Sequence, residues 1–249
     1  MTKADRAPVG FTYHIPHHAV TRKFRVVFDA SCKTTKNLSL NDVQLTGPRL
    51  QEDLWNLLIR FRNHRYGLIT DIRQMYRCVG ISPEQWELQR IFWRSNIDRP
   101  IEEYWLTTAT FGMTSAPHCA IRAMQQCAKD HEHKYPKAAK IVHEDFYVDD
   151  CLTGGSTLED VADIRRELTE LLAAGTFYPG QWHTNAEDSG HPEIVLGSSD
   201  ATTVLGLRWL PAKDELAIRL QDDILSTPRK VTKRIILSKY RNTAAIVNK

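Results

Sequence analysis

The chain has 249 residues, 42% of them hydrophobic and 25% charged, which allows one large domain or two modest ones with a substantial core. No apolar run reaches the ~18 residues of a membrane span, and the polar start lacks the apolar stretch of a signal peptide. Five cysteines without C-x-x-C spacing favour free thiols in a reducing compartment, and a net charge of +3 permits a nucleic-acid partner without requiring one.

The first half of the chain mixes short strands with helices. The β-rich run Arg25–Phe28 predicts a strand, and residues 37–48 predict a loop. Pro48 is expected to open a helix that carries leucines and Phe61 at helical spacing. The apolar run Tyr66–Ile72 predicts a buried strand with Asp71 at its end. A helix or turn is then expected from Ser82, and strands over 90–93 and 104–108.

The second half adds a helix from Ser115 and then a β-hairpin. The first hairpin strand is expected to include Ile141, Val142 and residues 146–148, and the second to run from Cys151 to Gly155. A capping-box pattern at Ser156–Glu159 opens a helix that Gly175 ends. Strands over 194–197, 204–209 and 216–218 and a basic helix from Thr227 follow. This order predicts an α+β fold with an antiparallel sheet.

Two adjacent carboxylates, Asp149 and Asp150, mark the tip of the predicted hairpin. Hard oxygen ligands on rigid strands suit a divalent-metal site for phosphoryl chemistry, although an Asp-Asp pair in a turn is by itself more often solvated. Because side chains alternate along a strand, only one of the pair points fully into a shared site unless the turn re-aims the other. Asp71 completes the set if its strand neighbours the hairpin in one sheet; otherwise it caps backbone N–H groups.

Other polar clusters are less specific. The runs His131-Glu132-His133 and His143-Glu144-Asp145 lack the ligand spacing of a zinc site, and we interpret them as solvated. Basic residues gather near the start, including Arg22 and Lys23, and again between 229 and 241. Each basic cluster fits either a solvated face or a surface that contacts phosphates.

Six segments in order resemble the reverse transcriptase domain of LTR retrotransposons, most closely the BEL/Pao group. They are Pro16–Val20, Phe24–Ser31, Leu38–Asp42, Asp71–Arg77, Phe111–Pro117 and Tyr147–Gly154. The resemblance covers roughly residues 11 to 225. It implies a right-hand polymerase with fingers over about 1–46 and 79–110 and a palm over about 47–78 and 111–225. The palm sheet would be antiparallel with helices packed on one face, and 226–249 would begin an incomplete thumb.

The resemblance also implies an activity, RNA-directed DNA polymerisation. Two ions of Mg²⁺ or Mn²⁺, held by Asp71, Asp149 and Asp150, would catalyse nucleotidyl transfer from a dNTP to a primer 3′-hydroxyl. The implied nucleotide-binding residues are Arg25, Gln74, Met75, Tyr76, Phe111 and Gly112, and the implied primer-binding residues are Tyr147, Leu205 and Gly206.

Some of these residues have simpler interpretations without the family. Arg25, which would bind the triphosphate, is otherwise a strand-edge charge, and Tyr76, which would exclude a 2′-hydroxyl, is otherwise a core tyrosine. Gly206 is otherwise a strand bulge. Two positions depart from the pattern: Phe111 stands where retroviral enzymes usually carry glutamine, and Arg73-Gln74 replaces a more acidic and basic pair.

The expected partners are an RNA or DNA template with its primer, dNTPs, and the protease, RNase H and integrase of a Pol polyprotein. No membrane partner is expected, and the expected location is the cytoplasm, including virus-like particles. Residues 239–249 do not continue the family pattern, so an alternative is an inactive retrotransposon remnant that keeps the fold and binds nucleic acid weakly. A third hypothesis is a metal-dependent phosphodiesterase, in which Arg25 and Tyr76 would have no role.

Overall fold

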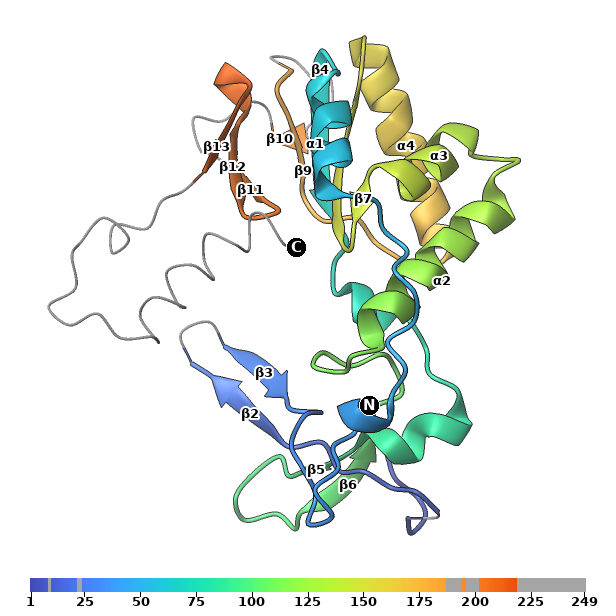
Figure 1. Cartoon of the computed structure of the whole chain (residues 1–249), viewed down its shortest axis with the longest axis vertical. Coiled ribbons are helices and arrows are strands. Elements are labelled where there is room, and N and C mark those ends of the chain that lie inside the picture. The colour runs from blue at the N-terminus through green and yellow to red at the C-terminus, as the bar shows by residue number, and fades with distance from the viewer. Residues whose placement is uncertain (9, 22–23, 187–193, 196–201, 219–249) are drawn as a thin grey trace, which may run out of the picture. The chain divides into compact units, whose positions relative to one another are not determined.

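The structure is a computed structural model that describes residues 1–8, 10–21, 24–186, 194–195 and 202–218. The chain divides into two compact units, which are described separately (Figure 1). Unit 1 comprises Met1–Leu50, Gln74–Lys129 and Ala174–Phe177, and unit 2 comprises Gln51–Arg73, Asp130–Ala173 and Tyr178–Lys249. The expected boundaries of fingers and palm stay a prediction.

Unit 1 contains two small antiparallel sheets and most of one long helix. Strand β2 (His17–Val20) pairs with β3 (Arg25–Phe28). A second sheet has the order β1 (Thr2–Lys3), β6 (Glu102–Trp105), β5 (Arg90–Trp93). Short 3₁₀ helices cover Asn41–Val43, Met75–Cys78 and Pro83–Gln89. The long helix α2 (Ala116–His131) presents Ile121, Met124 and Cys127 as buried residues, as its spacing predicts.

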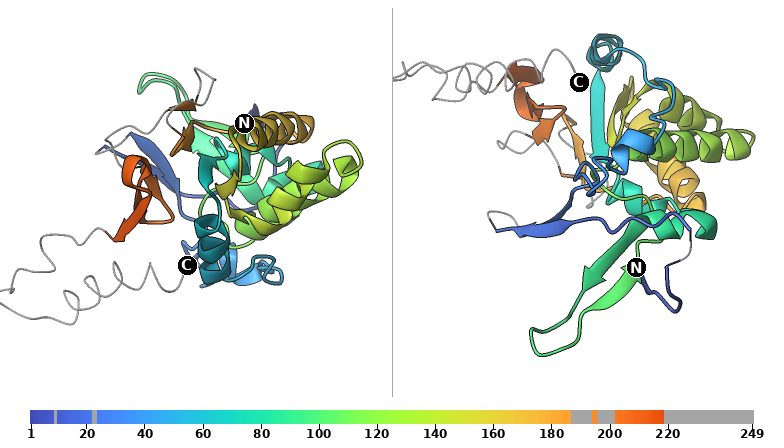
Figure 2. Two further views of the ribbon diagram at one scale, coloured as in Figure 1. Left: turned by 90° about the horizontal axis from the view of Figure 1, so that it is seen from above. Right: turned by 60° about the horizontal axis from the view of Figure 1, so that its bottom comes forward.

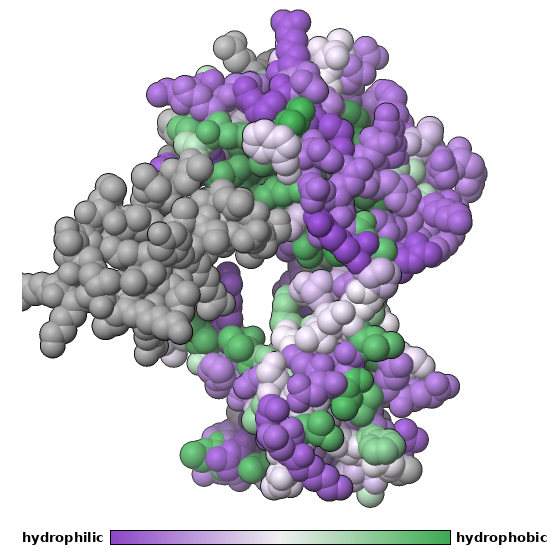
Figure 3. Space-filling view, in the orientation of Figure 1, coloured by the Kyte–Doolittle hydropathy of each residue, from purple (hydrophilic) through white to green (hydrophobic). Residues whose placement is uncertain are grey.

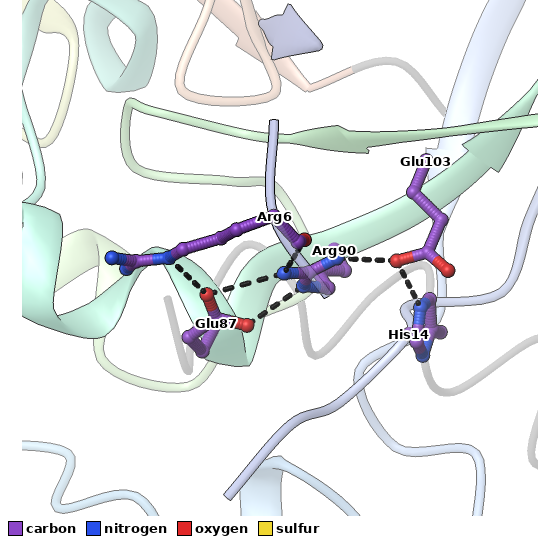
Figure 4. Close-up of polar contacts among 5 residues, drawn as sticks. All are labelled: Arg6, His14, Glu87, Arg90 and Glu103. Carbon is purple, nitrogen blue, oxygen red and sulfur yellow. Dashed lines mark hydrogen bonds and ion pairs between the residues drawn. The ribbon is translucent and has the colours of Figure 1, made fainter. Parts of the chain in front are cut away.

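A buried ion-pair network lies at the start of β5 (Figure 4). The Arg90 side chain is 0% exposed; its Nε lies 2.7 Å from Glu87 Oε2, and its Nη1 donates to Glu103. His14 Nε2 lies 3.3 Å from Glu103 Oε2, and Arg6 pairs with Glu87 at 3.4 Å. Hydrogen bonding from Arg90 holds the pKa of Glu87 below its ordinary value of 4.5. The ion pairs with Glu87 and Glu103 offset the free-energy cost of burying the Arg90 guanidinium.

Unit 2 is built on a five-stranded sheet. Its order is β10 (Ile194–Val195), β9 (Trp182–Thr184), β4 (Tyr66–Asp71), β8 (Asp150–Gly155), β7 (Phe146–Tyr147). All neighbouring strands are antiparallel except β10 and β9, which are parallel. A second antiparallel sheet holds β11 (Thr202–Val204), β12 (Leu207–Leu210) and β13 (Glu215–Ile218). A 3₁₀ helix over Pro211–Lys213 connects β12 to β13.

Both faces of the five-stranded sheet are covered. Helix α1 (Leu54–Arg62) packs Leu57 and Phe61 against Ile69 and Leu152, together with Trp209 of β12. The Phe61 and Trp209 rings meet edge to face at 5.4 Å. Helices α3 (Pro136–Glu144) and α4 (Leu158–Ala174) lie on the side away from β11–β13 (Figures 1 and 2), and their outer surface is hydrophilic (Figure 3). The expectation of helices on one face only was therefore wrong, because both faces of this sheet carry buried apolar residues.

Several expected elements are confirmed. Strand β3 spans Arg25–Phe28, β4 ends at Asp71, and β5 spans Arg90–Trp93. The predicted capping box is present one residue along: Thr157 Oγ1 accepts from Asp160 N–H at 3.1 Å, and Asp160 accepts from Thr157 N–H. The α+β class is confirmed, and the five cysteines, all within the described residues, are free thiols.

Other expectations were wrong in detail. Helix α1 begins at Leu54 after Asp53, not at Pro48. Ile141 and Val142 lie in α3 and not in a strand, because Pro136 at the first turn starts a helix that buries both. Strand β6 spans Glu102–Trp105 instead of 104–108, and the run 204–209 is broken by a turn at Leu205–Gly206. The basic helix from Thr227, the thumb region and the cluster at Arg22 and Lys23 lie outside the described residues.

No helix in the described ranges combines the length and the apolar character that crossing a membrane requires.

Candidate functional site

The β7–β8 hairpin places the adjacent aspartates at a tight, strained turn. Tyr147 pairs with Asp150, so Val148 and Asp149 form the turn. Val148 has a φ of +56°, a conformation that β-branched residues rarely adopt. The carbonyl of Asp149 accepts a hydrogen bond from the N–H of Ile72 at 2.8 Å, which ties the hairpin tip to the end of β4. Strain held by such contacts is typical of functional sites.

The register of β4 and β8 sets Asp71 directly opposite Asp150. Directly opposed residues of an antiparallel pair have their Cβ atoms about 4.5–5.5 Å apart on one face of the sheet. This is the face that also carries Ile69 and Leu152, which form the pair two residues further along each strand. Asp71 and Asp149 are exposed and Asp150 is half-buried. The expected neighbouring of the two strands is confirmed, while the role of the acids stays a prediction.

A short segment fixes the end of β4 from the other side. Arg73 N–H donates to the Tyr178 carbonyl at 2.9 Å, and Gly180 N–H donates to the Asp71 carbonyl at 2.6 Å. A Cβ atom at Gly180 would lie 1.8 Å from Asp71 Oδ1. Gly180 therefore leaves the space in which the Asp71 carboxylate lies. Sequence reasoning missed this residue, because the Pro179-Gly180 pair indicates only a turn.

His183 is a second residue that sequence reasoning missed. It pairs with Ile69 across β4 and β9, so it shares the face of the sheet that carries Asp71. Burial lowers the pKa of His183 below its ordinary 6.5, against the opposing effect of the Asp71 charge. Its Nδ1 lies 3.0 Å from Thr202 Oγ1. Burial therefore favours the neutral form of the His183 imidazole beside Asp71.

The predicted primer-binding residues lie next to the acids. Leu205 and Gly206 form the two-residue turn between β11 and β12, with φ values of +52° and +80°, as such hairpin turns require. Leu205 N–H donates to Asp150 Oδ2 at 3.4 Å. Tyr147 and Leu205 both pack against the cluster around Trp209. Unit 2 thus brings Tyr147, Leu205 and Asp150 together, and the interpretation of Gly206 as a bulge was wrong.

The carboxylate oxygens of these acids are hard ligands of the kind that a divalent metal such as Mg²⁺ takes. Across the part of the chain that the structure describes, no group of three or more His, Cys, Asp and Glu side chains is arranged to hold a metal ion. What the structure provides is the opposed pair Asp71 and Asp150, with Asp149 at the adjoining turn. Mg²⁺ usually takes one or two protein carboxylates and completes its shell with water and substrate phosphates. The pair fits Mg²⁺ or Mn²⁺ on that basis.

Unit 1 holds the predicted nucleotide-binding residues. Gly112 has a φ of +90°, and a Cβ there would lie 2.3 Å from the Phe28 carbonyl oxygen, so only glycine fits. Asn41, which sequence reasoning did not single out, holds this turn: its Nδ2 donates to the Gly112 carbonyl at 2.8 Å, and its Oδ1 accepts from Thr114 N–H. The Tyr76 and Phe111 rings meet edge to face at 5.0 Å. Unit 1 thus places Tyr76, Phe111 and Gly112 near one another.

The remaining nucleotide-binding candidates lie on a turn and a strand. Gln74 has a φ of +49°. Its carbonyl accepts a hydrogen bond from Arg77 N–H at 2.7 Å, and this bond closes a turn that contains Met75. The Met75 side chain is buried, so only its backbone is suited to contact a phosphate. Arg25 lies on β3 opposite Val20 with an exposed side chain.

Asp145 differs from its sequence interpretation. It was expected to be solvated with His143 and Glu144, yet its side chain is buried and pairs with Arg60 of α1 at 3.3 Å. Burial raises the pKa of Asp145, although hydrogen bonds from Thr153 and Arg60 oppose this effect. Arg60 also pairs with Glu52 at 2.8 Å and donates to the Glu144 carbonyl. This cluster anchors α1 to the end of α3 and is structural.

Comparisons with known proteins give a fold but no family. No protein-family model matches the sequence, and no curated protein matches it. A foamy viral protease-reverse transcriptase in complex with double-stranded DNA matches with a TM-score of 0.63 and 16% identity over 92% of this chain. The same type of protein with an RNA/DNA hybrid gives 0.62 and 15% over 93%, and a prototype foamy virus mutant gives 0.51 and 18% over 70%.

These matches show a fold of the retroviral reverse transcriptase type, in which helices combine with antiparallel sheets. The chain spans only 35%, 27% and 21% of the lengths of the three matched chains. At this level of identity the likeness concerns the fold alone.

Proposed function

We propose that this chain is an RNA-directed DNA polymerase domain that transfers a nucleotidyl group from a dNTP to a primer 3′-hydroxyl. The observation that carries the proposal is the register that sets Asp71 opposite Asp150, with Asp149 at the strained turn beside them. The reverse transcriptase fold supports the same conclusion.

In this proposal Asp71, Asp149 and Asp150 hold Mg²⁺ or Mn²⁺. Two bound ions would lower the pKa of the primer hydroxyl and neutralise charge on the triphosphate and leaving pyrophosphate. The role of the chain itself is to hold these three acids in place. The Ile72 N–H fixes the backbone of Asp149, the Leu205 N–H orients Asp150, and Gly180 leaves room for the Asp71 carboxylate. Fixed geometry of this kind lowers the barrier without covalent chemistry by the protein.

The other roles follow from the resemblance. Tyr147 and the Leu205–Gly206 turn would contact the primer end, and they already lie beside Asp150. In unit 1, Arg25 would bind the triphosphate and the backbone of Gln74 and Met75 its oxygens. Tyr76, held by the Phe111 ring, would exclude a 2′-hydroxyl and so select deoxynucleotides.

The proposed partner is a template with its primer. The matched foamy viral proteins carry double-stranded DNA or an RNA/DNA hybrid, which supports a nucleic-acid duplex as the ligand of this chain. We further propose that the chain belongs to a Pol polyprotein of the BEL/Pao type that acts in the cytoplasm. In the matched proteins a reverse transcriptase is likewise joined to a protease.

Primer extension tests the proposal directly. The chain, a primed RNA template, dNTPs and Mg²⁺ should give extended primer, and Asp150→Asn should reduce extension to background. Asp163→Asn is the matched control, since Asp163 is an acid on the surface of α4 that pairs with Arg166 at 2.9 Å. Extension that survives Asp150→Asn with unchanged rate would refute the assignment.

The inactive remnant stays the alternative. It predicts binding of primer–template that weakens steeply with salt, without preference for sequence and without extension. A folded sample that binds the duplex but extends no primer would favour it. Cleavage of the duplex in Mg²⁺ without dNTPs would instead favour the phosphodiesterase.

A further inference from the structure

Unit 1 contains a cavity of about 290 Å³ behind the β2–β3 hairpin. It is lined by Met1, by His17 of β2, by Val26 and Phe28 of β3, by Arg77, by Ile91 and Trp93 of β5, and by the segment Leu106–Phe111. The segment is held in place by backbone hydrogen bonds, from Ala109 N–H to the Val79 carbonyl at 2.9 Å and from Ile81 N–H to the Thr107 carbonyl at 3.0 Å. The cavity is therefore part of a fixed framework.

The face of β3 that lines the cavity is the opposite one from Arg25. Val26 and Phe28 line it, and residues alternate between the two faces of a strand, so Arg25 and Val27 point away. The cavity is for this reason distinct from the triphosphate position proposed above. Phe111 alone is shared with the proposed nucleotide-binding residues.

The lining combines flat aromatic walls with a single guanidinium group, and Met1 and His17 lie at it as well. Phe28, Trp93 and Phe111 supply aromatic rings, and the His17 ring lies 5.8 Å from that of Phe28 and 6.1 Å from that of Trp93. Arg77 is the one lysine or arginine among the described residues that line the cavity. Apolar walls with few polar groups are typical of small-molecule sites, and aromatic walls favour flat rings.

We infer that this cavity binds a planar aromatic carboxylate of one or two fused rings. The ring system would lie against the aromatic walls, and the carboxylate would accept two hydrogen bonds from the Arg77 guanidinium, whose fork matches that geometry. A volume of about 290 Å³ is at the lower end for ligand pockets, which suits a ligand of this size.

The probe for the test is 2-naphthoate, with 2-naphthylmethanol as its uncharged counterpart. Isothermal titration of the chain should give saturable binding of 2-naphthoate at one site. Arg77→Gln should weaken 2-naphthoate about 10- to 100-fold, the range for a hydrogen bond to a charged group, and leave 2-naphthylmethanol unchanged. The control Arg99→Gln changes an exposed arginine on the loop between β5 and β6 and should leave both affinities as they are.

A second pair of variants tests the location without altering the buried core. Val26 and Val27 are each 39% exposed, and only Val26 lines the cavity. Val26→Trp should fill the cavity and abolish binding of both probes, whereas Val27→Trp should not. Absence of saturable 2-naphthoate binding in the folded wild-type chain would overturn the inference. Equal binding by all variants would also overturn it, because the probe would then lie elsewhere. Neither outcome depends on polymerase activity.

Discussion

The substitution Gly180→Ala should disturb the proposed site without destabilising the fold, so its effects on activity and on stability can be distinguished. The added Cβ would lie 1.8 Å from Asp71 Oδ1, whereas real Cβ contacts essentially never fall below 3.0 Å. The oxygen must therefore move by at least about 1.2 Å, the difference between these two distances. Gly180 is not among the residues with positive φ, so alanine brings no backbone strain there.

The two expected effects differ greatly in size. Asp71 is exposed, so its carboxylate can rotate away at little cost, and the free energy of unfolding should change by less than about 1 kcal/mol. A displacement of about 1 Å in a catalytic group can lower a rate by about 100-fold. Primer extension should therefore fall by about that factor while the protein stays folded.

Single-nucleotide extension rates and urea unfolding would be measured on the same preparations. Gly80→Ala is the control, because a Cβ at Gly80 meets no atom within 4 Å. It should leave both quantities near their wild-type values. A Gly180→Ala protein that is fully active would show that the position of the Asp71 carboxylate does not matter to the reaction, and the proposed site would then be wrong.

Three further predictions concern stability. Arg90→Met should lower the free energy of unfolding by about 3–5 kcal/mol in urea titrations, because it leaves the carboxylates of Glu87 and Glu103 without their buried partner. Since Arg90 holds the pKa of Glu87 below 4.5, the stabilisation by Glu87 is complete above pH 4.5 and is lost as pH falls through the lower pKa of the folded state. Glu87→Gln should therefore flatten the fall in stability below pH 4.5, and an unchanged slope would contradict this cause. Thr157→Ala removes the cap of α4 and should cost about 1 kcal/mol, seen as a lower urea midpoint, whereas Thr157→Ser should not.

Local patterns predicted the elements that carry the acids. The apolar run that ends at Asp71 predicted β4, and the polar pair between two β-rich runs predicted the β7–β8 hairpin. These patterns are informative because strand-forming and turn-forming residues act on the backbone within a few positions. The same rules failed at Ile141 and Val142. Their β-branched character favours a strand, but burial within unit 2 keeps them in the helix that Pro136 begins.

What the sequence could not reveal depends on contacts between distant segments. The pairing of Asp71 with Asp150 joins residues 79 positions apart, and only the register of β4 and β8 decides it. Gly180 and His183 acquire their places beside Asp71 in the same way. Asn41 supports the Gly112 turn across 71 positions. Periodicity and spacing carry no information about such pairs.

The ladder between β4 and β8 also limits how the gene can change. Ile69 opposite Leu152 and Asp71 opposite Asp150 share one face because both strands keep the same count of residues between these pairs. Loss or gain of one codon inside either strand would turn every following side chain to the other face. Many single substitutions along these strands would leave the carboxylates opposed, whereas a one-codon deletion would part them. Among related copies, we therefore expect length differences to fall outside Tyr66–Asp71 and Asp150–Gly155.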